Sequence, residues 1–186
     1  MSTFTTSPDI SFGAYRVWQR NRDVLLQLWK SEFVAQLLEP VVVILALGIG
    51  LGRFVELDSG EEYAAFLAPG LIAMFPMFAA VFECAWGSYV RLEMQGTYRA
   101  IVATPVSVDD VITGEILWGT TRSVMNASYI LLVATVLTPW LHMVDSPWAV
   151  LIIPISAVPG VLFSAISICF ASIARAMSQF SYFFNL

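Results

Sequence analysis

The stretch "YAAFLAPGLIAMFPMFAAVFECAWGSYV", residues 63–90, decides the fold class, because it carries a single charged side chain, Glu83. An apolar run of about 18 or more residues is long enough to cross a membrane as a helix. Pro69-Gly70 and Pro76 lie inside the stretch. Proline removes a backbone hydrogen bond, so we expect a break or kink there. The stretch therefore predicts an interrupted membrane-spanning helix.

Three further apolar segments of the same kind cover residues 33–52, 111–139 and 148–174. The chain of 186 residues is 58% hydrophobic and only 12% charged. A soluble domain has roughly 25% charged residues. We therefore predict an all-α integral membrane protein with four transmembrane helices. The first 30 residues hold no apolar signal-peptide region, so the first span is expected to direct insertion.

The cysteines and the charged residues follow this division of the chain. Cys84 and Cys169 lie inside apolar segments, which predicts buried, unreactive thiols. Arginine and lysine gather before the first span, between the second and third spans, and after the fourth, whereas the loops 53–63 and 138–148 are acidic or lack them. By the positive-inside rule, the N-terminus and the loop between spans two and three are expected to be cytoplasmic.

The N-terminal segment divides into a tail and a helix. Residues 1–12 are rich in Ser and Thr and predict a flexible tail. In residues 13–30 polar side chains recur at steps of three and four, which predicts an amphipathic helix lying in the membrane interface. Its interfacial candidates are Arg16, Trp18, Arg20 and Lys30. A plain cytoplasmic extension of the first span is the alternative.

The polar passage "RLEMQGTYRAIVATPVSVDDVITGE", residues 91–115, predicts a structured loop. Gly96 suits the end of the second span's helix, and Thr97 can cap a short helix from Tyr98 to about Ala103. Pro105 forbids continuation of that helix. Ser107 to Asp110 resembles a capping box at the start of the third span. A turn that only connects two spans needs just a few polar residues. This loop is longer and structured, so we expect it to bind a soluble partner.

Three polar side chains lie inside the spans and are candidates for a pathway or gate. They are Glu83, Arg122 and Asn126. Arg122 and Asn126 are four residues apart, on one helical face, and intramembrane polar residues normally face a bundle interior or cavity. A purely structural pair between Glu83 and Arg122 is an equally open alternative.

The chain shows no pattern of a catalytic or metal site. Lys30 is not preceded by the glycines of a phosphate-binding loop. His142 stands alone, without metal-ligand spacing. No serine, histidine and acid share a plausible depth. We therefore expect no intrinsic enzyme activity, no bound metal and no cofactor in this chain.

Residues 63–137 resemble the ABC-2 type transporter permeases, in particular the nodulation-factor, drug and polysaccharide exporter-like subunits. The matching residues are the Phe66-Leu67-x-Pro69-Gly70-Leu71 entry, Arg91, Tyr98, Ala103-Thr104-Pro105 and Gly114-Glu115. The resemblance covers residues 13–186, which it makes one permease transmembrane domain. It implies a six-span fold, so that "SQFSYFFNL" at the C-terminus would begin a fifth span and the chain would be truncated.

The resemblance also implies partners and a place in the cell. Such permeases dimerise, as a homodimer or with a close paralogue, in the bacterial inner membrane. Two cytoplasmic ATPase subunits bind ATP and Mg and drive export. The exported substrate is an amphiphile: a lipid-linked saccharide, a polymer or a hydrophobic drug. A coupling helix between spans two and three docks on the ATPase, which makes docking candidates of Arg91, Glu93, Gln95, Thr97, Tyr98, Arg99 and Ile101.

Two other functions stay open. The chain could be a membrane scaffold whose loop docks a different cytoplasmic protein. It could also be a secondary transporter with Glu83 as a proton site, although residues 33–90 and 111–174 show no inverted repeat. A neighbouring gene for a phosphate-loop ATPase would favour the exporter over both. No feature points to nucleic acid as a partner.

Overall fold

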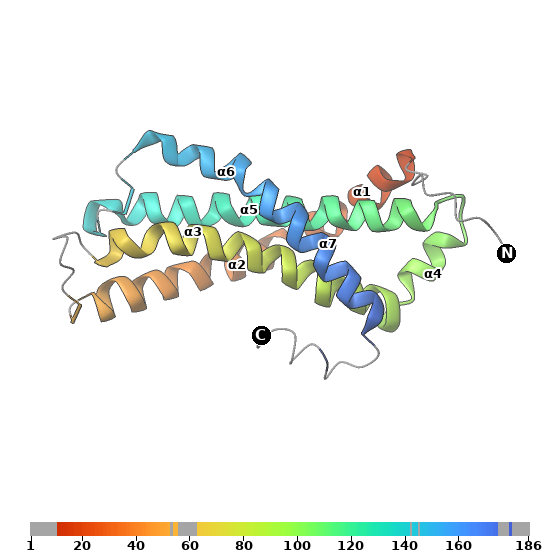
Figure 1. The fold of residues 1–186 in the computed structure, drawn as a ribbon, viewed down its shortest axis with the longest axis horizontal. Helices are drawn as coiled ribbons and strands as arrows, with labels where there is room; N and C mark the ends of the chain where they lie inside the picture. Colours follow the sequence, from red (N-terminus) through yellow and green to blue (C-terminus); the bar gives the residue numbers. More distant parts are fainter. Residues whose placement is uncertain are drawn as a thin grey trace.

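The computed structural model describes residues 11–52, 54–55, 63–141, 143–144, 146–174 and 179. These residues form helices and connecting turns, and no strand occurs among them, which confirms the predicted all-α class (Figure 1). Residues 1–10 of the predicted tail, and all of the predicted fifth span except Gln179, lie outside this description.

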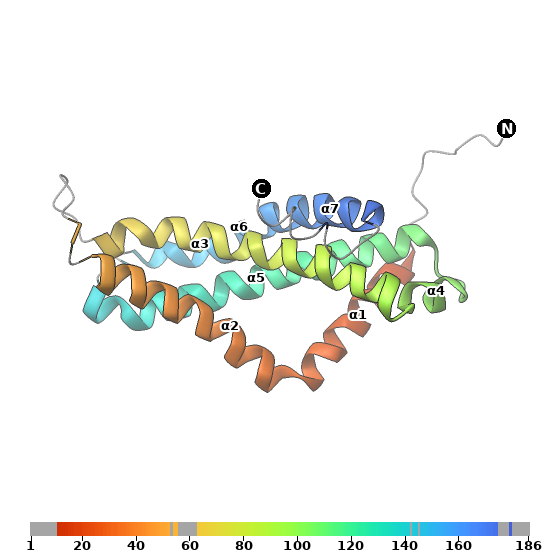
Figure 2. The same cartoon turned by 90° about the horizontal axis from the view of Figure 1, so that it is seen from below.

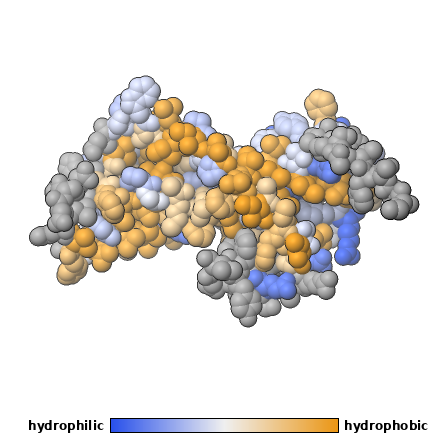
Figure 3. All heavy atoms as spheres, viewed as in Figure 1, coloured by the Kyte–Doolittle hydropathy of each residue, from blue (hydrophilic) through white to orange (hydrophobic). Residues whose placement is uncertain are grey.

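Four helical segments are long and apolar enough to cross a membrane, as predicted. They are Trp29–Leu51, Ala65–Met94, Val108–Trp140 and Pro147–Ile173. The first consists of α2 (Trp29–Ile44) and a π-helical segment, η1 (Leu45–Leu51). The third is one long helix, α5 (Val108–Leu141). Hydrophobic residues cover most of the face in Figure 3, and strongly hydrophilic ones gather at the end that carries α1 and α4.

The N-terminal helix α1 (Phe12–Gln27) ends earlier than predicted. Leu28 leaves the helical conformation, with φ −105° and ψ 12°, and joins α1 to α2. The two helices diverge at this point (Figure 2). Lys30 therefore belongs to the first span and not to the interfacial helix, which corrects the prediction. The helix also begins one residue early, because Ser11 caps it by accepting a hydrogen bond from Gly13 N at 3.0 Å.

Helix α1 packs closely against the start of α5. A Cβ atom added to Gly114 would lie 2.7 Å from the carbonyl oxygen of Ala14, so the two backbones approach as only glycine allows. Asp110 fixes the end of the contact, because its carboxylate accepts hydrogen bonds from Ser11 N at 2.6 Å and Ser11 Oγ at 2.8 Å. Helix α1 is therefore attached to the third span.

The second span does not break where its prolines predicted. Helix α3 (Tyr63–Phe82) is continuous through Pro69 and Pro76, so the predicted break is absent. Proline costs one hydrogen bond, but its φ is helical and a membrane helix tolerates it. Two π-helical segments follow instead, η2 (Glu83–Gly87) and η3 (Val90–Met94). The irregular part of the span is thus its charged second half.

The fourth span is interrupted at Ser156. A 3₁₀ segment, η4 (Pro147–Leu151), and the short α6 (Ile152–Ile155) precede the turn, and α7 (Ala157–Ile173) follows it. The Ser156 carbonyl accepts hydrogen bonds from Gly160 N and from Ser123 Oγ of α5, both at 3.0 Å, so α5 is tied to the fourth span at this turn. Cys84 is buried as predicted, but Cys169 is exposed on α7, which corrects the second half of that prediction.

The loop between spans two and three is structured, and α4 (Thr97–Val102) lies within one residue of its prediction. Gly96 ends the preceding helix in the left-handed region, with φ 63°. Thr97 does not cap α4: Gly96 holds the cap position, and the Thr97 hydroxyl donates to Gln95 Oε1 at 3.3 Å. The capping box is confirmed, because Asp110 N donates to Ser107 Oγ at 3.0 Å and Ser107 N to Asp110 Oδ2 at 3.3 Å.

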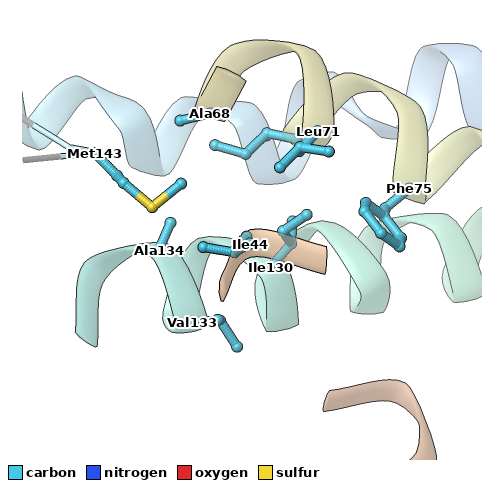
Figure 4. Packing of buried hydrophobic residues seen from close by; sticks show 9 residues of the cluster. Ile44, Ala68, Leu71, Phe75, Ile130, Val133, Ala134 and Met143 are labelled. Atoms are coloured by element: carbon cyan, nitrogen blue, oxygen red, sulfur yellow. The ribbon is translucent and has the colours of Figure 1, made fainter. Parts of the chain in front are cut away.

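The far half of the bundle, away from α4, is held by an apolar core. Helices α3 and α5 lie side by side (Figures 1 and 2), and Ile44 of α2 and the loop residue Met143 add to the core between them. Figure 4 shows these side chains interleaved between the helices. The core comprises Ile44, Ala68, Leu71, Ile72, Phe75, Ile130, Val133, Ala134 and Met143.

Candidate functional site

At the opposite end, five charged side chains form a continuous chain, called the charge network here. Its members are Glu32, Arg122, Glu83, Arg91 and Glu115. Arg122 Nη2 lies 2.9 Å from Glu32 Oε2, and Arg122 Nε lies 3.4 Å from Glu83 Oε2. Arg91 Nη1 lies 3.0 Å from Glu83 Oε1, and Arg91 Nη2 lies 2.7 Å from Glu115 Oε2. The network thereby joins α2, η2, η3 and α5.

The π-helical segments and a glycine make room for the network. Glu83 opens η2 and Arg91 lies in η3, so both ends of their ion pair come from the irregular part of the second span. A Cβ atom on Gly87 would lie 3.0 Å from Glu83 Oε1 and 3.1 Å from Arg91 Nη2. The ion pair therefore passes over the backbone at a position where glycine leaves space. π-Bulges are frequent at functional sites of helices.

Arg91 is the hub of the network. It donates to Glu83 and Glu115, and its Nε lies 3.4 Å from the hydroxyl oxygen of Tyr98 in α4. Its side chain is only 12% exposed and Glu115 is 2% exposed. Buried charges are tolerated when they are paired and hydrogen-bonded. Arg91 was predicted to face a docking partner, but the structure places its guanidinium inside the protein.

Helix α1 contacts the same network. Asn21 Nδ2 donates to Glu115 Oε1 at 3.1 Å, and Trp18 Nε1 donates to Thr121 Oγ1 at 2.9 Å. Burial lowers the pKa of Arg20 from its ordinary value, although nearby Glu115 acts in the opposite direction. Burial likewise raises the pKa of Tyr98. Of the interfacial candidates, Arg16 and Lys30 are exposed, whereas Trp18 and Arg20 are partly buried.

Two cavities meet at the Glu83–Arg122 pair. One, of about 390 Å³, lies toward α1 and is also lined by Arg20, Glu32 and Arg91. The other, of about 340 Å³, lies toward the middle of the spans and is also lined by Asn126. The structure thus brings Glu83, Arg122 and Asn126 together around one cavity. Glu83 and Arg122 line both cavities, so this ion pair stands between them.

The docking candidates divide by exposure. Glu93, Gln95 and Arg99 are exposed, and Thr97, Tyr98 and Ile101 are partly buried. Thr97 and Ile101 line a groove of about 680 Å³ between α4 and the start of α1, and Arg16 lines its other side. The end of the bundle that carries α4 therefore offers both a charged surface and a groove.

Sequence reasoning missed three members of this site. They are Glu32, Glu115 and Asn21. Glu115 lies inside an apolar span, so the rule that selected Glu83 would have found it. Glu32 and Asn21 lie outside the predicted spans and carry no such signal. Among the described residues, no group of three or more His, Cys, Asp or Glu side chains is placed to hold a metal ion.

The spans, the transverse helix α4 and the buried charges define a polytopic membrane subunit, and comparison with known proteins names its family. Residues 15–186 match the family described as ABC-2 type transporter. The chain therefore belongs to the ABC-2 type transporter family and is a membrane subunit of a transporter.

Relatives named Nodulation protein J support the same assignment. The protein from Rhizobium leguminosarum bv. trifolii is 31% identical over 98% of this chain and 68% of its own length. Those from Azorhizobium caulinodans and Rhizobium meliloti are 30% and 28% identical over 90% and 91% of this chain, and 64% and 63% of their own lengths. The chain thus spans about two thirds of the length of these relatives. No solved structure matches it significantly.

Proposed function

We propose that the chain is the permease subunit of an exporter in the bacterial inner membrane, driven by a separate cytoplasmic ATPase subunit. In this proposal ATP and Mg are bound by the partner, the N-terminus is cytoplasmic, and a second permease copy or a close paralogue completes the transporter. The exported substrate is an amphiphile, such as a lipid-linked saccharide, a polymer or a hydrophobic drug. The observation that carries the proposal is the match of residues 15–186 to the ABC-2 type transporter family. The contact between Tyr98 of α4 and Arg91, the hub of the charge network, supplies a route from the loop to the spans.

The ATPase would dock on the exposed side of α4. Arg99, Glu93 and Gln95 offer charged and amide groups there. The groove between α1 and α4 has apolar lining residues against which a helix of the partner could pack, and Arg16 lies at its side. Charged groups at the rim of an interface set partner choice and association rate, and the buried centre contributes more of the affinity.

Movement of α4 would reach the spans through the network. A displacement of Tyr98 shifts the environment of Arg91, which binds acids of both η2 and α5. Glu83 then transmits the change to Arg122, and Arg122 to Glu32 of α2. A buried charge that loses its partner destabilises the protein. The network therefore favours a few discrete arrangements of the helices over a continuous range of positions. Glu83, Arg122 and Asn126 are accordingly the pathway or gate residues of the proposal.

The proposal is tested by co-expressing the chain with candidate ABC ATPase subunits from the same genome, followed by co-purification and measurement of ATP hydrolysis. Arg99→Glu reverses an exposed charge on α4 and should reduce co-purification. Arg22→Glu reverses an exposed charge on α1 that is paired with Asp23, and it should leave assembly unchanged. Failure of the wild-type chain to bind any ATPase would overturn the proposal. Equal assembly by both variants would remove Arg99 from the docking surface.

A further inference from the structure

The cavity toward the middle of the spans has the composition of a ligand site. Residues of α2, α3, η2 and α5 line it, and its volume is about 340 Å³. One wall consists of three phenylalanines of α3, Phe75, Phe78 and Phe82. The opposite side carries Arg122 and Asn126 of α5. An intramembrane cavity that joins aromatic rings to a few convergent polar groups is the usual setting of a binding site.

Two buried polar atoms on this wall lack a partner in the described part of the chain. Asn126 Oδ1 accepts no hydrogen bond there, and Arg122 Nη1 donates none. Asn126 is 7% exposed, so bulk solvent hardly reaches it. The remaining donors of Arg122 are engaged: Nη2 binds Glu32 and Nε faces Glu83. Buried polar groups are normally satisfied, and exceptions call for an absent partner.

We infer that this cavity binds the uncharged, hydroxyl- or amide-bearing head of an amphiphile, at a site formed within one copy of the chain. The inference rests on the proposed function, because it assigns a position to the substrate of the exporter. It concerns Asn126, Arg122 and the phenylalanine wall.

The chemistry of the two unpartnered atoms selects the head. Asn126 Oδ1 needs a donor, and Arg122 Nη1 needs an acceptor. A hydroxyl group supplies both, and so does an amide. A quaternary ammonium head supplies neither, so it would leave both atoms unpartnered, even though Glu83, Glu39 and the aromatic rings attract its charge. A phosphodiester supplies an acceptor but no donor for Asn126, and its charge would lie near the carboxylates of Glu83 and Glu39, which also line the cavity.

The phenylalanine wall selects the remainder of the ligand. Phe75, Phe78 and Phe82 follow the i, i+3, i+7 spacing of one helical face. Phe78 is 44% exposed, so its ring is open to an occupant. Phe82 is 57% exposed, and its ring also stacks on that of Trp86, with 6.4 Å between the centroids. Aromatic rings pack favourably against C–H surfaces and offer no hydrogen-bond acceptor that competes with Asn126. A head that presents hydroxyls on one side and C–H groups on the other fits both walls.

The test is photolabelling of the full chain in lipid nanodiscs with an alkyl glucoside that carries a diazirine next to the sugar. Labelled peptides are mapped by mass spectrometry. We expect label on the segment 75–82 of α3. Dodecyl maltoside should displace it about fivefold to tenfold better than dodecylphosphocholine or dodecyltrimethylammonium, which share its alkyl chain. Equal displacement by all three would overturn the inference, because only the apolar chain would then be recognised.

Matched variants locate the site. Asn126→Leu keeps the approximate volume but removes the amide, and it should lower labelling about fivefold or more. Ser128→Ala is the control, because the Ser128 hydroxyl bonds to Val124 O of its own helix and does not line the cavity. Asn126→Leu removes an unpartnered buried group, so its unfolding temperature should not fall. Unchanged labelling in a folded Asn126→Leu variant would contradict the inference.

The outcome is separable from that of the proposed function. Labelling needs no ATPase, so it is measured with the chain alone and with the co-purified complex. Selective labelling without ATPase assembly would retain the site and reject the exporter. ATPase assembly without selective labelling would retain the exporter and reject the site.

Discussion

The two halves of the α3–α5 pair are held together in different ways. In the far half, Leu71 and Phe75 pack against Ile130 with no charged side chain in the core. In the half near α4, the second and third spans are joined by buried ion pairs centred on Arg91, which binds Glu83 of η2 and Glu115 of α5. Apolar packing tolerates small shifts at modest cost, whereas a buried charge needs a partner in every arrangement. The far half therefore holds the two helices together by apolar packing. In the charged half, any rearrangement of the helices has to re-pair the buried charges.

The largest effect should come from breaking the hub. Arg91→Met leaves Glu83 and Glu115 without their shared cation and should destabilise the chain by about 3–5 kcal/mol. Thermal unfolding in nanodiscs measures the loss. Arg22→Met, which breaks the exposed pair with Asp23, should change stability by about 1 kcal/mol or less. Equal effects of the two variants would show that the network contributes no more than a surface pair.

A smaller loss is expected from the apolar half. Ile130→Ala opens a cavity in the core between α3 and α5 and should cost about 2 kcal/mol, mainly in lost packing contacts. Leu132→Ala removes a similar volume from a side chain that is 52% exposed, and it should cost about 0.5 kcal/mol or less. Both are read by thermal unfolding. An equal loss in the two variants would mean that the far half is not a packed core.

The last stability test concerns the attachment of α1. Gly114→Ala places a methyl group against the Ala14 carbonyl and should cost about 1–3 kcal/mol, depending on how far α1 yields. Gly70→Ala meets nothing within 4 Å, so it should be neutral or stabilise α3 by up to about 1 kcal/mol. Chemical denaturation of both variants measures the difference. A neutral Gly114→Ala would show that α1 is not pressed against α5.

Most of the fold was readable from the sequence, because hydropathy dominates inside a membrane. The four spans, the left-handed Gly96, the short helix α4 and the Ser107–Asp110 capping box are all local features, and the structure confirms them. The predictions that failed depend on how a residue packs against other helices, which the local sequence does not show. The prolines of α3 were expected to break it, yet the irregular turns lie later, at Glu83 and Val90. Lys30 was assigned to the interfacial helix because its periodicity continues past the turn at Leu28.

The site was less predictable, because its pairs are distant in the chain. Glu83, Arg122 and Asn126 were found by the rule that intramembrane polar groups have a purpose. Which groups pair was not readable: Glu32 and Arg122 meet across 90 positions of sequence. Arg91 was a docking candidate because of the family resemblance, but it lies in η3 and pairs with Glu83 and Glu115. Side-chain direction in an irregular helix depends on packing and not on periodicity alone.

In the proposed exporter, docking of the ATPase at α4 acts on the charge network through Tyr98. Cys84 is a built-in reporter, because its thiol is buried beside the network and lies 3.5 Å from the Glu115 carbonyl oxygen. The decisive measurement is the rate at which methyl methanethiosulfonate modifies Cys84 in the ATPase complex, with and without ATP. It is made in a Cys169→Ser background, with and without Tyr98→Phe. We predict that ATP changes the rate in the parent chain and that Tyr98→Phe, which removes the contact with Arg91 but keeps the ring, abolishes the change without loss of assembly. The same ATP-dependent change in both chains would contradict the claim.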